Sequence, residues 1–224
     1  MNIIKIFLDN NQVLLEALLN TLKMTVVSLL FATLIGLLIS LLSLSKFKIF
    51  RLLARIYVDI FRGVPMIVLI MFVYFGLPQG LQSIGFVNFR FKVFTAGALA
   101  LSLNAGAYMA EIIRGGILAV DKGQTEAAMS LGLEGPMAMK EVILPQAFKI
   151  MMPSIINQFI ITLKDTSLIS VISFAEIVRT GQIIIARSAA YTLQVWTVIG
   201  MLYLVMIIPL SYLGRYVEKK VSHG

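Results

Sequence analysis

Cysteine is absent from this sequence of 224 residues, and only one histidine is present. The missing cysteines exclude a disulfide framework and any cysteine-based metal site. The single histidine, His223, lies in the C-terminal tail, where we expect it to be inert rather than a ligand. No metal site is therefore predicted.

Charged residues are also scarce: they make up 13% of the chain, whereas hydrophobic residues make up 59%. This balance lies outside the range of ordinary soluble domains and is typical of a membrane protein. Acidic residues are fewer than basic residues: the chain has 11 Asp and Glu and 19 Lys and Arg. In a membrane protein such an excess indicates basic cytoplasmic loops, so no nucleic-acid partner is predicted.

The phosphate-binding pattern G-x-x-x-x-G-K-[ST] does not occur in the sequence either. Because this pattern supplies the backbone amides and the lysine that hold a nucleotide's phosphates, we do not expect the chain to bind ATP through a P-loop. The chain is predicted to bind no cofactor and not to be an enzyme. If ATP drives its work, ATP and Mg²⁺ are bound by a separate ATPase polypeptide.

Five apolar stretches are each long enough for a membrane-spanning helix, which needs about 20 mostly apolar residues. They comprise residues 22–44, 57–77, 93–113, 152–174 and 191–213. Residues 1–20 place apolar residues at helical spacing between polar ones, which predicts an amphipathic helix at the membrane interface. The predicted fold is a single all-α transmembrane domain covering residues 1–224, with a kink at Pro65 in its second span.

The orientation in the membrane follows from the distribution of lysine and arginine over the connecting segments. Most of the lysines and arginines lie within residues 45–55, within residues 121–149 or near the C-terminal end. Because basic segments stay in the cytoplasm, these three segments are predicted to be cytoplasmic. With five spans, the N-terminus is then on the outer side.

The loop of residues 121–149 contains the most distinctive pattern of the chain. Glu126-Ala127-Ala128 is followed after three residues by Gly132, and nine residues later by Val142-Ile143-Leu144-Pro145. Glycine and proline interrupt helices, so Gly132 and Gly135-Pro136 predict two short helices joined by a bend. The two alanines let a partner approach closely, and Glu126 offers a charge for pairing.

Two adjacent charges, Lys164 and Asp165, lie near the middle of the fourth predicted span. A charge at that depth costs at least ~2.5 kcal/mol and normally faces a cavity or a partner. Consecutive helical residues point in different directions, so these two cannot easily satisfy only each other. A polar face of the same helix includes Asp165 together with Ser154, Gln158 and Thr162. A substrate pathway and structural pairing are both open for this charge pair.

The third span carries a second polar stripe, formed by Asn104, Tyr108 and Glu111 at helical spacing. Asp59 and Arg62 of the second span are expected at a depth similar to that of Glu111 and Arg114. Ion pairs between the two helices are the preferred interpretation for the arginines, whereas Glu111 and Asp59 could also bind substrate.

A zwitterionic amino acid would suit these polar residues, because it needs a cation for its carboxylate and an anion for its ammonium group. Lys164 is the candidate cation, and Asp165 or Glu111 is the candidate anion.

The spacing of the loop resembles the coupling loop of ABC importer permeases. Further segments look like the permeases of polar amino acid importers, the histidine, glutamine and arginine uptake group: residues 62–65, 74–78, 106–111, 114–117 and 163–168. The resemblance covers residues 20–215 and implies the type I importer fold in a bacterial inner membrane. The polar residues on the spans make Asp59, Asn104, Tyr108, Glu111, Thr162, Lys164, Asp165 and Ser167 the candidate substrate-binding residues. The resemblance implies docking to the ATPase by Glu126, Ala127, Ala128, Gly132 and Leu133.

The same resemblance implies the partners and the mechanism. Such permeases pair as homodimers or close heterodimers in membrane lipid, bind two ATPase subunits, and receive substrate from an extracytoplasmic amino-acid-binding protein. ATP binding would move the coupling helices and switch the pathway between inward-facing and outward-facing states.

Three other points remain open from the sequence. The acidic residues favour a basic amino acid, namely arginine, lysine or histidine, but glutamine or glutamate is an alternative. A secondary transporter without an ATPase would also use intramembrane charges, although the loop argues against it. A purely structural subunit would not need two polar stripes.

Overall fold

The computed structural model describes residues 3–187 and 189–222, and these residues form helices joined by short connections; His223 lies outside them. The elements are α1 (Ile3–Asp9), α2 (Asn11–Ser43), α3 (Lys48–Gly63), α4 (Met66–Met71), η1 (Phe72–Gly76), α5 (Leu77–Ser83), α6 (Val93–Leu118), α7 (Lys122–Ser130), α8 (Gly135–Ala138), η2 (Met139–Ile143), α9 (Leu144–Asp165), η3 (Thr166–Ile172), α10 (Ile177–Arg187), η4 (Ala189–Tyr191) and α11 (Thr192–Ser222). The predicted all-α fold is confirmed.

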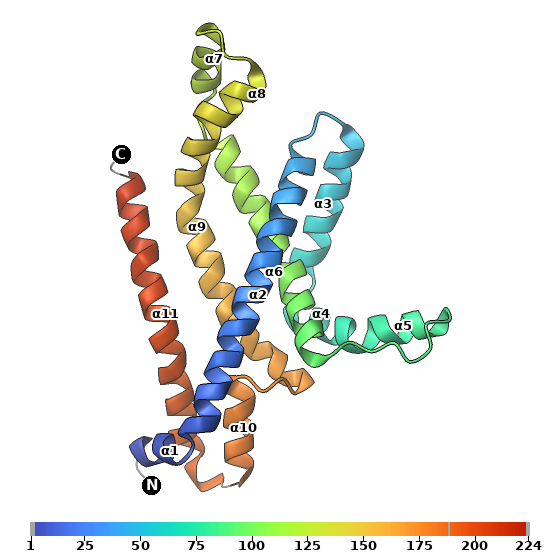
Figure 1. The fold of residues 1–224 in the computed structure, drawn as a ribbon, viewed down its shortest axis with the longest axis vertical. Coiled ribbons are helices and arrows are strands. Elements are labelled where there is room, and N and C mark those ends of the chain that lie inside the picture. The colour runs from blue at the N-terminus through green and yellow to red at the C-terminus, as the bar shows by residue number, and fades with distance from the viewer. Residues whose placement is uncertain (1–2, 188, 223–224) are drawn as a thin grey trace.

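Four long helices, α2, α6, α9 and α11, run side by side along the molecule (Figure 1). The short helices α7 and α8 lie at one end of this bundle, here called the loop end, and α1 and α10 lie at the other, the amino end. Five helical segments of the described chain are long and apolar enough to cross a membrane, as predicted. Helix α1 and the C-terminal end of α11 lie at opposite ends of the bundle (Figure 1), as an odd number of spans requires.

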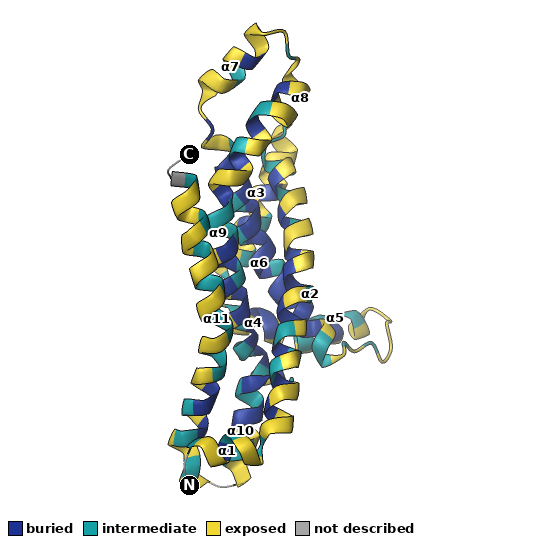
Figure 2. Ribbon diagram, turned by 60° about the vertical axis from the view of Figure 1, so that its left-hand side comes forward, coloured by how far each residue is buried: buried dark blue, intermediate teal, exposed yellow. Residues whose placement is uncertain are grey.

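The centre of the bundle is α6, whose residues are mostly buried, whereas the outer faces of α2 and α11 are exposed (Figure 2). Many exposed side chains are large and apolar, for example Leu30 and Leu38 on α2 and Val205 on α11. Apolar side chains on the outside of a helical bundle are what a lipid environment requires.

Helices α2 and α6 approach each other closely at a glycine of α2. A Cβ atom added to Gly36 would lie 2.5 Å from the Cβ of Met109 and 3.1 Å from the backbone nitrogen of Ala110. Small residues allow helices in membranes to pack backbone against backbone, which dispersion forces then stabilise. Gly36 therefore fixes the distance between the first and third spans.

The N-terminal region is divided differently from the single interfacial helix predicted for residues 1–20. Only α1 lies across the end of the bundle, and α2 runs on from Asn11 without a break. The side chain of Asn10 donates a hydrogen bond of 3.0 Å to the carbonyl oxygen of Ile6 and closes α1. The buried Ile6 and Leu14 pack against α11 with Val195, which holds α1 on the bundle.

The predicted span of residues 57–77 is not one helix. Helix α3 ends at Gly63, Val64 is extended with φ −87° and ψ 129°, and α4 starts at Met66. Proline disfavours the helical conformation of the residue before it and lacks an amide hydrogen, so Pro65 separates two helices rather than kinking one. The chain then turns sideways, and α5 projects from the bundle (Figure 1).

Two wide π-helical turns each precede a proline. η1 ends just before Leu77-Pro78, and η2 ends just before Leu144-Pro145. A π-turn bonds each amide one residue further back, so it accommodates a residue that lacks the amide hydrogen. Consequently the second half of the predicted loop 121–149 continues directly into α9, which begins at Leu144.

Candidate functional site

The gap between α3 and α4 exposes backbone groups that the neighbouring helix α6 satisfies. The side-chain amide of Asn104 donates a hydrogen bond of 2.7 Å to the carbonyl oxygen of Phe61, in the last turn of α3. In the opposite direction, the hydroxyl of Tyr57 on α3 donates a hydrogen bond of 2.8 Å to the carbonyl oxygen of Leu103 on α6, which adds a second link between the two helices. Interrupted helices persist in a membrane only where the freed backbone groups find such partners. Asn104 therefore anchors the break to the centre of the bundle.

A cavity of about 360 Å³ lies at this break. Its lining residues come from four helices (α3, α4, α6 and α9) and the break itself: Arg62, Gly63, Val64, Pro65, Met66, Asn104, Tyr108, Gln158, Ile161 and Asp165. The fold thus brings together three of the predicted site residues, Asn104 and Tyr108 from α6 and Asp165 from α9. A cavity of this size, mostly apolar with a few polar groups, is typical of a small-molecule site.

Glu111 lies in a network of two arginines beside the cavity. Its two carboxylate oxygens accept hydrogen bonds of 3.0 Å each from Nε and Nη2 of Arg114. Arg62, from the end of α3, approaches Glu111 to 3.7 Å and lies over the Tyr108 ring, 5.0 Å from its centroid. The predicted ion pair between the second and third spans is therefore present for Arg62 and Glu111.

Two of the four charges do not pair across the helices in the described chain. Arg114 was predicted to do so, but it pairs with Glu111 within α6, and Asp59 does not join this network. It pairs with Arg55, one turn earlier on α3, at 3.7 Å. Both side chains are largely exposed, so this pair is expected to contribute little stability. Glu111 and Asp59 stay candidates for substrate binding, and their surroundings differ sharply.

The two adjacent charges at the end of α9 are separated as the helix geometry requires. Lys164 is exposed on the bundle, and Asp165 is half-buried at the cavity. In the described part of the chain neither side chain forms an ion pair within 4.0 Å. An unpaired charge on an otherwise apolar span is expected to face a cavity, a partner or a ligand.

Two further predicted residues lie outside the cavity lining. Thr162 is buried, and its hydroxyl donates a hydrogen bond of 2.9 Å to the carbonyl oxygen of Gln158. It also accepts one of 3.3 Å from the Gln158 amide. Ser167, in η3, is half-buried. Gln158, from the same polar face of α9, lines the cavity in place of Thr162.

The α7–α8 hairpin stands beyond the loop end of the bundle (Figure 1). Asp121 caps α7 by accepting a 2.7 Å hydrogen bond from the amide of Gly123. Gly132 ends the helix with φ +87°, and the amides of Gly132 and Leu133 donate to the carbonyls of Met129 and Ala128 at 3.0 and 3.1 Å. This is a Schellman termination, which needs a residue in the left-handed region. The glycine of the loop pattern therefore has a conformational role.

The predicted docking residues of this hairpin differ in exposure. Glu126, Ala127 and Gly132 are exposed and Leu133 is half-buried, whereas Ala128 is buried. Large apolar side chains that the motif does not mark are exposed around them: Met129, Leu131, Met137 and Met139. Exposed apolar patches mark interaction surfaces. The sequence could have indicated this surface, because leucine and methionine are unusual beside the turns of a loop that is predicted to lie outside the membrane.

A buried carboxylate at the amino end was not singled out from the sequence. Glu176 is fully buried and accepts hydrogen bonds from the amides of Val178 and Arg179, at 2.8 and 2.6 Å, in the first turn of α10. Burial raises the pKa of Glu176 to about 7, although the two amides and Tyr203 oppose the shift.

Within the described residues no cluster of three His, Cys, Asp or Glu side chains could hold a metal ion.

Comparison with known proteins places this geometry in a family. Residues 25–223 match the family described as binding-protein-dependent transport system inner membrane component. The arginine transport system permease protein ArtQ of Bacillus subtilis is 40% identical over 210 residues, which cover 93% of this chain and 92% of that protein. The glutamine transport system permease protein GlnP of Escherichia coli K12 is 40% identical over 169 residues, covering 75% and 74%.

Solved structures agree with this assignment. A chain described as part of an amino acid ABC transporter with histidines has a TM-score of 0.88 and 37% identity, and the match covers 98% of this chain and 99% of that one. A chain of the inward-facing MetNI methionine ABC transporter has a TM-score of 0.76 and 20% identity, covering 94% and 96%, which shows likeness of fold alone. The chain therefore belongs to the binding-protein-dependent transport system inner membrane components, the multi-pass permease subunits of ABC importers with the type I fold.

Proposed function

We propose that this permease forms the translocation pathway of an ATP-driven amino acid importer and that its substrate is a basic amino acid. The observation that carries this proposal is the cavity at the α3–α4 break, where Asn104, Tyr108 and Asp165 converge. Asp165 offers a carboxylate without an ion-pair partner in the described chain, suited to an ammonium group. Lys164 is close in sequence and exposed, and is the proposed ligand of the substrate carboxylate.

The names of relatives support an amino acid substrate and leave two candidates. ArtQ of Bacillus subtilis is named for arginine and matches over 93% of this chain. GlnP of Escherichia coli is named for glutamine, at the same identity over 75%. Arginine is favoured because Asp165 supplies a negative charge at the cavity, whereas for glutamine Asp165 would bind the α-ammonium group alone. Lysine and histidine fit the same site, and glutamate is the less favoured alternative.

The α7–α8 hairpin is the proposed contact with the ATPase. Its exposed apolar side chains, with Leu131 85% exposed, form a surface that a partner's groove would cover. Glu126, Ala127 and Gly132 would lie at this contact, and Ala128 would support α7 from within. In this family the ATPase is a separate subunit. ATP and Mg²⁺ would therefore be bound outside this chain.

The arrangement in the membrane follows from the same assignment. The loop end would face the cytoplasm, and the amino end would face outward and receive substrate from a binding protein. A second copy of the chain would complete the pathway, because Lys164 is exposed on the bundle in the isolated chain and an exposed intramembrane charge needs a polar neighbour. ATP-driven movement of the hairpins would alternate the access of the pathway.

The test is ATPase activity of the complete importer in lipid, measured with the binding protein and a panel of amino acids. Stimulation by arginine, lysine or histidine supports the proposal, and stimulation by glutamine or glutamate supports the second candidate. Lys164→Met and Asp165→Asn should abolish the stimulation while the complex still assembles. Lys149→Met, an exposed lysine on the same helix, is the control and should leave stimulation unchanged.

Two outcomes would contradict the proposal. Unchanged stimulation in both Lys164→Met and Asp165→Asn would remove these residues from the substrate site. Transport by a chain that does not associate with an ATPase would support an ATPase-independent transporter instead.

A further inference from the structure

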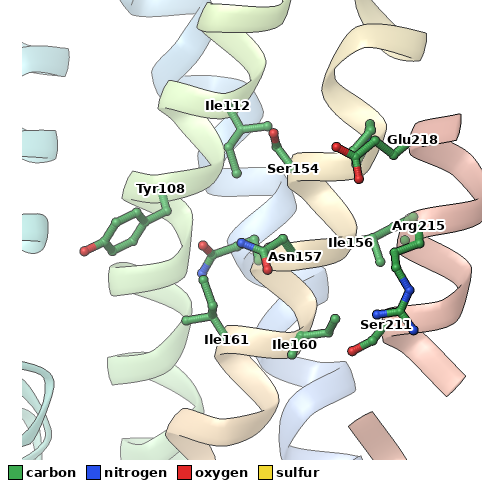
Figure 3. Close-up of a pocket in the computed structure, with 13 residues that line it drawn as sticks. Tyr108, Ile112, Ser154, Ile156, Asn157, Ile160, Ile161, Ser211, Arg215 and Glu218 are labelled. Carbon is green, nitrogen blue, oxygen red and sulfur yellow. The ribbon is translucent and has the colours of Figure 1, made fainter. Parts of the chain in front are cut away.

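A second and larger cavity, of about 640 Å³, lies between α6, α9 and α11 (Figure 3). It is lined by the last third of α11, around Ser211, Arg215 and Glu218, so it lies toward the loop end. It shares Tyr108, Gln158 and Ile161 with the cavity at the α3–α4 break, so the two cavities adjoin. The volume is within the range of sites that bind small molecules.

The lining of this cavity combines apolar side chains with polar groups that form no hydrogen bonds within the described chain. Ile112, Ile156 and Ile160 form the apolar part. The polar side chains are those of Ser154, Asn157 and Ser211. None of these three forms a hydrogen bond with another side chain or backbone group of the described chain, whereas their neighbour Gln158 bonds to Thr162. Each hydroxyl or amide can both donate and accept, so all three are available to a ligand.

Two opposite charges lie at the edge of the cavity without neutralising each other. Arg215 and Glu218 are three residues apart on α11, a spacing at which helical ion pairs commonly form. No ion pair within 4.0 Å joins them among the residues that the structure describes. The guanidinium of Arg215 is instead held over the ring of Tyr212, 4.4 Å from its centroid.

The directions of these two side chains define the ligand chemistry. In Figure 3 the carboxylate of Glu218 points toward Ser154 on α9, whereas the guanidinium of Arg215 extends along α11 toward Ser211. Stacking on Tyr212 orients the guanidinium and leaves its N–H edge free for an anion. The cavity therefore presents a cation and an anion at separate positions, together with apolar side chains.

We propose that this cavity is a second binding site, which takes a zwitterion with one anionic and one ammonium group. Arg215 binds the anionic group, Glu218 binds the ammonium group, and Ser154 and Asn157 add hydrogen bonds. A free amino acid and the headgroup of an ethanolamine phospholipid share this chemistry. The residues that bind here are separate from Lys164 and Asp165, so the proposal does not depend on their role.

The experiment uses the purified importer complex with both possible sources tested separately. In detergent without ethanolamine lipid, binding of L-arginine and L-glutamine is measured by calorimetry, both in the unchanged protein and in an Asp165→Asn background that removes the carboxylate of the first cavity. In nanodiscs, retention of phosphatidylethanolamine against phosphatidylglycerol is measured by native mass spectrometry. Both measurements are repeated with Arg215→Gln and Glu218→Gln, and Lys220→Gln is the control on the exposed end of α11.

An affinity for amino acid that falls at least tenfold in both Arg215→Gln and Glu218→Gln, but not in Lys220→Gln, assigns the site to the free amino acid. Selective retention of the ethanolamine lipid that both variants lose assigns it to the lipid headgroup. If neither amino-acid affinity nor lipid retention changes in Arg215→Gln or Glu218→Gln, the proposal is wrong. Arg215 and Glu218 are exposed, and unchanged thermal unfolding will show that the variants remain folded. Loss of transport in Lys164→Met alone tests the proposed function and leaves this result unaffected.

Discussion

The hydroxyl of Tyr203 in α11 donates a hydrogen bond of 3.2 Å to Oε2 of Glu176, the residue before α10. The same carboxylate accepts two backbone amides of the first turn of α10. First-turn amides of a helix have no partner within the helix, and a carboxylate there also interacts favourably with the positive end of the helix dipole. Glu176 thus closes α10 and fastens it to α11 at the amino end.

This connection predicts how stability depends on pH. Burial raises the pKa of Glu176 to about 7 in the folded protein, from an ordinary value of 4.5. Between pH 4.5 and 7 the folded state keeps a proton that the unfolded state has released, so the contribution of Glu176 to stability is present at low pH and is lost as pH rises to 7. The loss amounts to about 3 kcal/mol at most.

The measurement is thermal unfolding in detergent from pH 4.5 to 8, for the protein and for Glu176→Gln. The variant has no titrating proton at this position, so its unfolding temperature should fall less over this range. The control is Glu134→Gln, which replaces an exposed carboxylate in the α7–α8 hairpin. Its unfolding temperature should depend on pH in the same way as that of the unchanged protein. Identical pH profiles for the protein and Glu176→Gln would show that Glu176 does not titrate in this window.

The contact of α2 with α6 at Gly36 predicts opposite effects for two glycine substitutions. Gly36→Ala places a methyl group 2.5 Å from the Cβ of Met109 and should destabilise the bundle by about 1–3 kcal/mol, because the helices must separate. Gly115→Ala on α6 meets no atom within 4 Å and should be neutral or stabilising by up to about 1 kcal/mol. Thermal unfolding of both variants checks this, and equal stability would exclude a tight contact.

The termination of α7 predicts a conformational rather than a steric effect. A Cβ at Gly132 meets no atom within 4 Å, but φ is +87°, so Gly132→Ala should cost about 1–2 kcal/mol locally. Gly135→Ala, three residues later and without a positive φ, is the control. Hydrogen exchange of the backbone amides at positions 132 and 133 should become faster in Gly132→Ala and stay unchanged in Gly135→Ala. Unchanged exchange in Gly132→Ala would mean that the turn tolerates a side chain.

Much of the fold was predictable because apolar length and helix breakers are local properties of a sequence. The five spans, the all-α class and the turn at Gly132 follow from such local signals. The division of the second span did not follow, because Pro65 is compatible with a kink or with a full break. Asn104 decides between them by satisfying the carbonyl of Phe61 from another helix, and a sequence does not show which helices are neighbours.

The candidate site was predictable to the same extent. Helical spacing placed Asn104 and Tyr108 on one face of α6, and both line the cavity with Asp165. Spacing did not show that Thr162 would be buried and hydrogen-bonded to its own helix, or that Gln158 would line the cavity. It also did not show that Glu176 would be buried, since that depends on the packing of α10 against α11.

The last prediction separates two carboxylates that the sequence treated alike. Glu111 is held by Arg114 at 3.0 Å and by Arg62 at 3.7 Å, and its side chain is 33% exposed. Glu111→Gln should destabilise the protein by about 1–2 kcal/mol, because two guanidinium groups lose their common anion. Asp59→Asn should change stability by less than about 0.5 kcal/mol, because its side chain is 69% exposed and its only ion-pair partner is Arg55 at 3.7 Å in the described chain.

Thermal unfolding at low and high salt tests this difference, and the effect of Glu111→Gln should shrink with salt because ions screen a partly exposed network. Equal effects of the two variants would show that the Glu111 network adds no stability. Substrate affinity measured on the same two variants answers a separate question. A stability loss with unchanged affinity makes Glu111 a structural anion that orients Arg62 over Tyr108. A loss of affinity in Glu111→Gln, in protein that is still folded, would instead place Glu111 among the groups that bind the substrate ammonium.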